Sequence, residues 1–455
     1  MSETTTTRKA PPTPKEKHWL VGHVNMMRED AIGMVKDFIS KYGNIFSLAI
    51  PFHRGVVVAD PTYARYVLLD NNKNYTKSLA YDMLKPLLGN GLLTSEGDFW
   101  KQQRKLIQPA FHKKKLEELT AMMVERSEHW VDRIDAHAAG GEAFDVLPEM
   151  TALTLDVISK AIFSKGVEDK AQIVGDQITY LNEHTVERLH QPFRLPETIP
   201  TPFNRKARKS IELLDKVIYE IIDERRREGV SKDDLLSMLI DAQDEETGIG
   251  MDNKQLRDEV MTIFLAGNET SSNALTWTLY LLSQHPEAEA RMIAEIDQKL
   301  DSGVKVDFTT VNEFQYVRQV IDESMRVHPP VWIVGRRAIE ADEIGGYYIA
   351  PQTNVVVPII YLHHSPKYWD QPEKFMPERF APEKRNSIDR YVYMPFGGGP
   401  RLCIGNNFAM LEMQIILITL YRRFRFRLRE GFEVEQEPLV TLRPKNGMQM
   451  IAERR

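Results

Sequence analysis

Apolar residues recur at helical spacing over much of the segment from residue 61 to residue 330. The pattern is clearest in Leu116–Ala136 and Lys206–Arg227, where charged residues separate the apolar positions, as expected for helices with one solvated face. Glu259–Gln284 is apolar almost all round, which predicts a helix that crosses the centre of a domain. The dipeptide His285–Pro286 predicts the end of this helix and the start of the next one.

Short β-branched runs predict a minor amount of sheet near the two ends of the chain. Two such runs flank the sequence PFHRG within Ile45–Asp60 and predict a hairpin. Residues 336–362 and 432–453 hold further β-like runs, with Gly-Gly and Pro-Lys-Asn-Gly turns. The proline-rich segment His190–Phe203 predicts a loop, because no regular helix tolerates that many prolines. The fold class is therefore mainly α with a minor β portion.

The first 17 residues are rich in Thr and Pro and predict a disordered or loosely packed tail, followed by a single folded domain over residues 18–455. A chain of 455 residues is long enough for one large α-rich unit with a substantial core. The net charge of −6 provides no basic field that would favour nucleic acid. The N-terminus has no apolar signal region and no apolar run is long enough to span a bilayer, so we expect no transmembrane anchor and a cytoplasmic location.

The one cysteine of the chain, Cys403, lies in the sequence FGGGPRLCIG over Phe396–Gly405. A single cysteine excludes a structural disulfide and a multi-cysteine zinc or iron–sulfur site within the chain. The glycines and the proline predict a tight turn whose backbone approaches something flat and close. An apolar helix is predicted from about Gly405 to about Arg423, and the positive end of its dipole favours a thiolate over a thiol. Without this context, Cys403 would be interpreted as a small buried hydrophobe.

The sequence AGNET, Ala266–Thr270, interrupts the long apolar helix with a glycine, an acid and a hydroxyl. Buried Glu269 and Thr270 are costly unless they are solvated or used, and Gly267 weakens a helix by roughly 1 kcal/mol relative to Ala. A helix that tolerates these costs at one point is expected to open a groove there. The alternative is a Thr270 hydroxyl bonded back to the preceding turn and a Glu269 in an unrelated ion pair.

The spacing Phe-x-x-Gly-x-Arg-x-Cys-x-Gly resembles the cysteine-loop signature of the cytochrome P450 family. The resemblance extends from near Trp19 to the C-terminus and implies the family fold, a triangular helical domain around a long central helix with small β-sheets. It also implies haem b as cofactor, with the Cys403 thiolate as axial ligand of the iron. Phe396 would pack beside the sulfur, Arg401 would pair with a haem propionate, and Gly405 would belong to the haem-binding loop.

The pentad Ala266–Thr270 matches the acid–alcohol motif of the same family, and the resemblance gives the groove a role. Ala266 would face the haem, and the groove would hold dioxygen and water over the iron. Thr270 would hydrogen-bond the reacting oxygen, and Glu269 would help to relay protons from solvent as a general acid. The protein would supply protons, orientation and exclusion of water, while the haem iron does the oxidising.

Glu323 and Arg326 are spaced i, i+3 on a predicted helix that ends before His328, so their side chains meet on one face. Alone, they fit a surface ion pair of little consequence. Together with the downstream sequence PERF, Pro377–Phe380, they resemble the structural triad of the family. Glu323, Arg326 and Arg379 are therefore assigned to maintenance of the fold behind the cysteine loop, not to chemistry.

The resemblance implies three more haem-propionate partners, Trp100, Arg104 and Arg336. Trp100 and Arg104 lie one helical turn apart and share a face, although a core Trp beside an Arg that extends to solvent explains the pair equally well. Arg336 precedes the Glu343–Gly346 turn at the family's spacing, and its neighbour Arg337 competes with it for the inward position.

Apolar residues at five positions are implied to line the substrate pocket: Leu93, Ala266, Val331, Ile333 and Val440. Each of them fits ordinary core packing equally well. Val440 precedes a predicted turn at Leu442–Pro444. An apolar pocket favours a hydrocarbon substrate. The sequence over Gly89–Trp100 is similar to fatty-acid, terpenoid and carotenoid hydroxylases of the family.

The implied function is a haem-thiolate monooxygenase, an oxidoreductase that hydroxylates an apolar substrate with O2 and with electrons from NAD(P)H. The chain has no flavin- or iron–sulfur-binding segment of its own, so an external ferredoxin or flavodoxin and its reductase are required. Lys101, Lys105 and Lys113–Lys115 form either a solvated face or a docking patch for that acidic donor. Two alternatives are a peroxygenase driven by hydrogen peroxide and a haem protein that senses or carries a ligand. Neither requires the Glu269–Thr270 pair.

Overall fold

The structure is a computed structural model that describes residues 9–164, 199–229, 234–244, 248–301 and 305–455. It also describes residues 173, 175–177, 180–181, 184–185 and 187. The chain divides into two compact units. The first unit takes Met1–Met83, Met325–Phe375 and Pro382–Cys403, and the second takes Leu84–Ser324, Met376–Ala381 and Ile404–Arg455. Most of the predicted loop at 190–203 lies outside the described residues, and the single domain over residues 18–455 stays a prediction.

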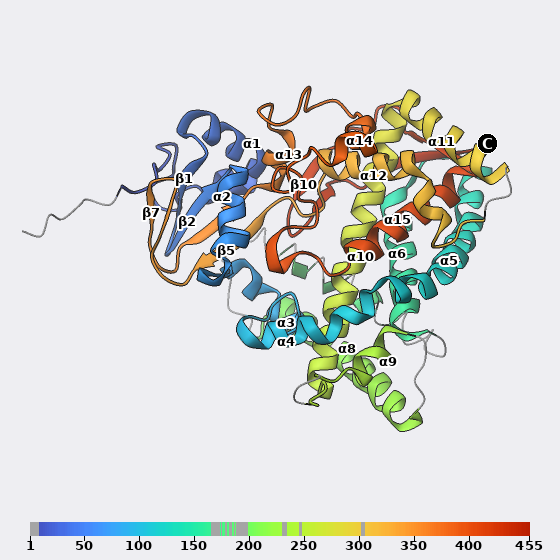
Figure 1. Cartoon of the computed structure of the whole chain (residues 1–455), viewed down its shortest axis with the longest axis horizontal. Coiled ribbons are helices and arrows are strands. Elements are labelled where there is room, and N and C mark those ends of the chain that lie inside the picture. The colour runs from blue at the N-terminus through green and yellow to red at the C-terminus, as the bar shows by residue number, and fades with distance from the viewer. Residues whose placement is uncertain are drawn as a thin grey trace, which may run out of the picture. The chain divides into compact units, whose positions relative to one another are not determined.

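The first unit is built on a five-stranded sheet that includes β1, β2 and β5 (Figure 1). Its strand order is β1-β2-β8-β5-β3. The strands of this unit are β1 (Ile45–Ile50), β2 (His53–Val58), β3 (Tyr75–Lys77), β5 (Val334–Ala338), β6 (Asp342–Ile344), β7 (Tyr347–Ile349) and β8 (Asn354–Val357). Strands β2 and β8 are parallel, and the other neighbours in the five-stranded sheet are antiparallel. The predicted hairpin in Ile45–Asp60 is confirmed, because β1 and β2 pair in register from Ile45 with Val58 to Ile50 with His53.

Two buried clusters form the core of the first unit. Its helices are α1 (Val24–Tyr42), α2 (Pro61–Arg65), α13 (Ile359–His364) and α14 (Pro382–Arg385), with the short helical turns η1 (Tyr66–Asp70), η2 (Asn72–Asn74), η3 (Leu79–Met83) and η7 (Gly399–Arg401). Successive residues of a strand point to opposite faces of a sheet. Val56 and Val58 accordingly join one cluster, whereas Val57 joins a second cluster that includes Phe38 of α1. Helix α1 is therefore packed on one face of the sheet.

Part of the predicted N-terminal tail is packed against the first unit. The backbone N–H of Ser47 donates to the carbonyl of Pro12 at 2.8 Å, and that of Tyr348 donates to the carbonyl of Lys9 at 2.8 Å. Pro11 and Pro14 are buried. A disordered tail does not describe residues 9–14, because their backbone extends the hydrogen bonding of neighbouring strands. Residues 1–8 lie outside the described residues.

The second unit is mostly helical. Its helices are α3 (Lys85–Leu88), α4 (Gly97–Ile107), α5 (Lys113–Gly140), α6 (Val146–Phe163), α8 (Pro202–Glu228), α9 (Leu235–Asp241), α10 (Asn253–Gln284), α11 (Pro286–Asp301), α12 (Gln315–Val327) and α15 (Asn406–Tyr421), with η4 (Gln108–Phe111), η5 (Thr310–Glu313) and η6 (Pro377–Phe380). The last three residues of α12 belong to the first unit. The predicted helices over Leu116–Ala136 and Lys206–Arg227 are confirmed as parts of α5 and α8.

Helix α10 is the long central helix of the second unit, and it is buried on nearly every side, including at Phe264, Leu275 and Trp277. It begins at Asn253 rather than at Glu259, so the predicted start was wrong. The first turns are polar, and they are helical because the Asp252 carboxylate caps them by accepting from the backbone N–H of Gln255 at 2.7 Å. The predicted break at His285–Pro286 is confirmed by the end of α10 and the start of α11.

Two small sheets complete the second unit. One contains β4 (Phe144–Asp145), β12 (Gln449–Arg454) and β9 (Phe424–Leu428) in the order β4-β12-β9, and the other pairs β10 (Gln436–Pro438) with β11 (Leu442–Pro444). The predicted turn at Leu442–Pro444 was wrong, because these residues form β11. The turn of this hairpin lies at residues 439–441, where the backbone N–H of Leu439 donates to the carbonyl of Thr441 at 3.0 Å.

The proposed structural triad makes buried polar contacts. In the second unit, the fully buried Glu323 carboxylate accepts from the backbone N–H of Met376 at 2.8 Å and from Nε of Arg379 at 3.2 Å. In the first unit, the Arg326 guanidinium donates to three backbone carbonyls, those of His363, Pro372 and Lys374, at 2.9, 2.9 and 3.1 Å. Glu323 ties helix α12 to residues 376–379, and Arg326 ties it to the end of α13 and to the chain that follows α13.

Glu323→Ala is expected to destabilise the protein, because it leaves the Arg379 guanidinium and the Met376 amide without their buried acceptor. Breaking a buried ion pair in this way costs about 3–5 kcal/mol. The measurement is the thermal unfolding midpoint by circular dichroism. The matched control is Glu313→Ala, which removes an exposed partner of Lys299 at 3.4 Å and should cost less than about 1 kcal/mol. Equal losses in the two variants would contradict the structural role of Glu323.

Candidate active site

The cysteine loop of the first unit is a tight turn closed by a backbone hydrogen bond. The N–H of Cys403 donates to the carbonyl of Phe396 at 3.0 Å, so the residues between them form a closed loop. Gly397 and Gly399 have φ values of +75° and +67°, which side chains rarely adopt. A Cβ on Gly399 would collide with the carbonyl of Leu68 in η1. The close backbone approach that the structure shows is made to the carbonyl of Leu68, and an approach to a flat group stays a prediction.

Cys403 is exposed, as is its neighbour Leu402, so the thiol is not a buried core group. Among the described residues, no group of three or more His, Cys, Asp or Glu side chains could hold a metal ion. A metal bound at Cys403 would therefore have at most two ligands of these types among the described residues and would have to bring its other ligands with it. Haem iron meets this condition, because the macrocycle supplies four nitrogens and the protein supplies an axial thiolate. The donor set fits haem.

The two candidate arginines of β5 differ in burial. Arg336 is 6% exposed and lies on the same face of the strand as buried Val334 and Ala338, whereas Arg337 is partly exposed. The Arg336 Nη1 donates to the carbonyl of Gly335 at 3.1 Å. The alternation of a β-strand therefore points Arg336, not Arg337, into the interior of the first unit.

We expect Arg336→Ala to reduce haem retention by about 10-fold or more. The resemblance assigns the Arg336 guanidinium to a haem propionate, and a hydrogen bond to a charged group contributes roughly 1.5–3 kcal/mol. Haem content per polypeptide, measured after transfer to a haem-accepting protein, reports the effect. Arg337→Ala is the matched control on the opposite face of the same strand and should retain haem as the parent does. A larger loss in the Arg337 variant would reverse the assignment.

Helix α4 of the second unit carries Trp100 and Arg104, both partly buried, one turn apart. Lys101 and Lys105 are exposed on the same helix and pair with Asp98 at 2.7 Å and Asp244 at 3.1 Å. Lys113 and Lys114 are exposed as well.

The lysine cluster of the sequence is smaller in the structure than predicted. Lys115 is only 6% exposed and pairs with Glu118 at 3.0 Å. Its place in a solvated or docking face was therefore wrong, because its position on α5 aligns it with buried Leu119 rather than with Lys114. Lys101, Lys105, Lys113 and Lys114 keep the exposure that a docking face requires.

The centre of α10 opens at Ala266. This residue is exposed although Leu265 and Asn268 beside it are buried. The Thr270 hydroxyl donates to the carbonyl of Ala266 at 2.7 Å, which is the back-bonded arrangement of an intrahelical threonine. Because its proton is used on this carbonyl, the Thr270 oxygen presents lone pairs as a hydrogen-bond acceptor.

Gly267 has a packing role on α10. A Cβ at this position would lie 3.1 Å from Cδ1 of Ile158 on α6. The Thr154 hydroxyl of α6 also donates to the side-chain oxygen of Asn268 at 2.7 Å. The glycine therefore allows α6 to approach α10 closely, which the sequence did not indicate. Ala266 is exposed beside this contact, and the groove expected here from the sequence stays a prediction.

Glu269 is held by a residue that sequence reasoning missed. The Thr441 hydroxyl donates to Oε1 of Glu269 at 2.6 Å and accepts from Nδ2 of Asn273 at 3.0 Å. Burial raises the pKa of Glu269, while the Thr441 hydroxyl and the charge of Arg443 act in the opposite direction. The carboxyl group is therefore protonated to higher pH than an ordinary glutamate, which suits a proton donor.

The candidate pocket residues fall in both units. In the second unit, Leu93 is partly buried, Ala266 is exposed on α10, and Val440 is 41% exposed at the turn of the β10–β11 hairpin. Val440 is adjacent to Thr441, so the same turn contacts Glu269. In the first unit, Val331 and Ile333 are partly buried directly before β5.

The sequence matches a model of the cytochrome P450 family over residues 11–451. The chain belongs to the cytochrome P450 family. It is 32% identical over 426 residues to a protein of Streptomyces melanosporofaciens named cyclooctat-9-en-7-ol 5-monooxygenase, a match that covers 91% of each chain. It is 30% identical over 474 residues to protein LUTEIN DEFICIENT 5, chloroplastic, of Arabidopsis thaliana, which covers 98% of this chain and 77% of that protein. The crystal structure of the cytochrome P450DA heme domain is similar with a TM-score of 0.87, 25% identity and 98% coverage of both chains.

The protein is therefore a cytochrome P450 monooxygenase with the mainly α fold of this family. Its cofactor is haem, and the axial thiolate comes from Cys403, the one cysteine of the chain. As a member of the family it takes electrons from redox partners and acts on apolar substrates. None of the described helices has both the length and the apolar character needed to cross a membrane.

Proposed function

We propose that this protein hydroxylates an apolar molecule of the fatty-acid, terpenoid or carotenoid kind. The overall reaction is RH + O2 + 2 electrons + 2 protons → ROH + H2O. The observation that supports it is the contact of Glu269 with Thr441 at 2.6 Å, since it brings a proton-holding acid to the turn that carries the exposed, apolar Val440, three residues along α10 from the exposed Ala266. The Streptomyces relative is named for oxygenation of an unsaturated alcohol, which agrees with an apolar substrate.

The roles of the chain's own residues follow from their contacts. Haem, held through Cys403, would supply the oxidising chemistry. Ala266 leaves room on α10 for substrate and dioxygen, because its side chain is small and exposed. Thr270 would accept a hydrogen bond from water at its Oγ1, since its proton is directed to the Ala266 carbonyl. Glu269, with its raised pKa, would hold a proton at its carboxyl group and release it toward the groove.

The electron donor in this proposal is an external ferredoxin or flavodoxin with its NAD(P)H-dependent reductase. Lys101, Lys105, Lys113 and Lys114 are exposed and would attract an acidic donor. The pairing of Lys101 with Asp98 leaves less net charge at that point than the sequence suggests. The attraction would be strongest at low ionic strength.

The experiment is a titration of the purified ferric holoprotein, followed in the visible spectrum, with a long-chain fatty acid, a sesquiterpene, a steroid and a carotenoid. A shift from low to high spin with one class identifies a ligand that displaces water from the iron. Conversion of that ligand with a ferredoxin or a flavodoxin system then identifies the product and the better donor. Absence of a spin shift with all four classes would overturn the apolar-substrate proposal.

A further inference from the structure

The turn that precedes α4 lies directly against α10. We call Gly89–Thr94 the GNG turn. A Cβ on Gly89, whose φ is +58°, would collide with the carboxylate of Asp258, and a Cβ on Gly91 would collide with the Thr262 hydroxyl. The two glycines therefore bring the backbone of the turn to α10 without side chains between them.

Two consecutive acids of α10 hold alternate amides of this turn. Oδ2 of Asp258 accepts from the backbone N–H of Asn90 at 2.9 Å, and Oε2 of Glu259 accepts from that of Leu92 at 2.9 Å. The acids are buried, with exposures of 3% for Asp258 and 0% for Glu259. Inside the turn, the Thr94 hydroxyl donates to the carbonyl of Gly89 at 2.9 Å.

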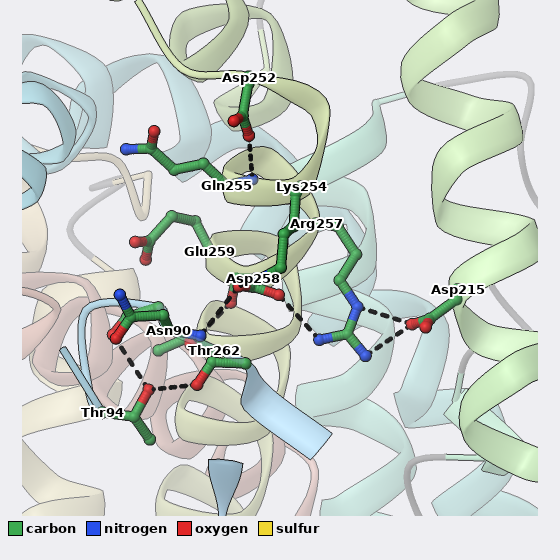
Figure 2. Close-up of polar contacts among 12 residues, drawn as sticks. Asn90, Thr94, Asp215, Asp252, Lys254, Gln255, Arg257, Asp258, Glu259 and Thr262 are labelled. Atoms are coloured by element: carbon green, nitrogen blue, oxygen red, sulfur yellow. Dashed lines mark hydrogen bonds and ion pairs between the residues drawn. The ribbon is translucent and has the colours of Figure 1, made fainter. Parts of the chain in front are cut away.

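The two acids differ in their charged surroundings. Asp258 also accepts from Nζ of Lys254 at 2.7 Å and from Nη1 of Arg257 at 3.0 Å, and Arg257 reaches Asp215 of α8 at 2.6 Å. Figure 2 shows Asp258 between Asn90 and Arg257, with Glu259 directed away from Arg257. Asp258 is thus a charged anchor with two cations beside it.

Glu259 is the neutral member of the pair. Its Oε1 has no hydrogen-bond partner among the described residues, and burial raises its pKa to about 8. A protonated carboxyl group still accepts from Leu92 through its carbonyl oxygen, so the contact does not require the charge.

The residue held by Glu259 is adjacent to a candidate pocket residue. Leu92 precedes Leu93. On α10, Glu259, Ile263, Ala266 and Thr270 follow each other at spacings of four, three and four residues, which places them on one face of the helix. Glu259 and Ala266 are two turns apart, or about 10 Å along the axis. The hydrogen bond from the Leu92 amide to Glu259 thus lies on the same face of α10 as the exposed Ala266.

We propose that Asp258 and Glu259 are positioning residues for substrate, which fix the GNG turn and Leu93 relative to Ala266 and so determine the shape of apolar ligand that the site accepts. Of the two, Glu259 sets the position of Leu93, since it holds the adjacent amide. The inference rests on the proposed function, in which Leu93 and Ala266 contact substrate. It adds two buried acids of α10 to the residues that determine the shape of the site.

The experiment uses the holoprotein and the variants Glu259→Leu and Glu259→Gln. Leucine removes the acceptor at similar volume, whereas glutamine keeps a carbonyl oxygen for Leu92. Two probes ligate the iron without any assumption about substrate: imidazole and the bulkier 4-phenylimidazole. The readout is the ratio of their dissociation constants from visible spectra. Deuterium uptake by the peptide that contains residues 89–95 reports separately on how firmly the GNG turn is held on α10.

With Glu259→Leu, the expected result is faster deuterium uptake in residues 89–95 and a change of about 5-fold or more in the probe ratio, the equivalent of one lost hydrogen bond. With Glu259→Gln, both quantities should stay within about 2-fold of the parent, as for a retained acceptor. Gly91→Ala pushes the turn off α10 from the other side and should change the ratio too, which keeps a test available if Glu259→Leu does not fold.

The matched control is Glu289→Leu, which removes another buried acid of the second unit, one that lies on α11 and is paired with Arg427 at 2.9 Å. It should lower the unfolding temperature and leave the probe ratio unchanged. An equal change of the ratio in this control would overturn the inference, as would unchanged uptake in Glu259→Leu or faster uptake with an unchanged ratio. Failure of the proposed function is a separate result, because it would appear as no spin shift of the parent protein with the four apolar classes.

Discussion

Cys403→His is expected to abolish oxygenation while leaving a protein that can still bind haem. The thiolate donates electron density to the iron and favours cleavage of the O–O bond, and a neutral imidazole does not do so to the same degree. The loss in product formation should be at least about 100-fold, since a barrier higher by roughly 3 kcal/mol is sufficient. The reduced carbon monoxide spectrum measures the change of ligand, and product formed in the reconstituted system measures the loss.

The matched control for this prediction is Leu402→Ala. Leu402 is 38% exposed and precedes the ligand, so the substitution alters the same loop without changing the sulfur. Its carbon monoxide spectrum should keep the thiolate form, and its turnover should stay within about 2-fold, as expected for the truncation of an exposed side chain. Undiminished turnover in Cys403→His would remove the central assignment of the site.

The helices and strands that could be predicted from the sequence are those whose apolar pattern is contained within one element. The hairpin β1–β2 and the helices α5 and α8 repeat their apolar residues at a fixed period, and this period depends only on the geometry of one element. The start of α10 did not follow, because its first turns are polar. They are helical through the Asp252 cap and the Lys254–Asp258 ion pair, which apolar periodicity does not detect.

The candidate site could be predicted where a motif is contiguous, and not where two distant segments meet. Glu269 and Thr270 are neighbours in a pentad, and their location on a long helix follows from the pattern. The partner of Glu269, Thr441, is 172 positions away, and spacing along the chain contains no information on such a pair. A hydroxyl within the apolar run Leu439–Leu442 was the one signal available. The burial of Lys115, by contrast, follows from its phase on α5, so it was open to prediction.

Thr270→Ala is expected to separate electron consumption from product formation. The variant loses the hydroxyl that in the proposed function accepts a hydrogen bond from water beside Ala266, while the haem ligand Cys403 is untouched. Product formed per NAD(P)H consumed should fall by about 10-fold or more, which lies below the 10²–10⁴-fold range of general acid–base catalysis because water replaces part of the function. Thr276→Ala is the control, since its hydroxyl also donates to a carbonyl of α10, that of Ser272 at 2.8 Å, but is fully buried. Full coupling in Thr270→Ala would exclude the relay.

Glu269 adds a pH dependence to the same relay. A group that acts as an acid works in its protonated form, so its contribution is present at low pH and is lost as pH rises through its pKa. Burial raises that pKa, which moves the loss to higher pH than for an ordinary glutamate. In a plot of product formed per electron against pH, this loss appears as a descending limb at high pH. Glu269→Gln should remove that limb. Thr441→Val should move it to still higher pH, because the Thr441 hydroxyl stabilises the carboxylate and lowers the pKa. A limb that is unchanged in both variants would assign the proton to another group.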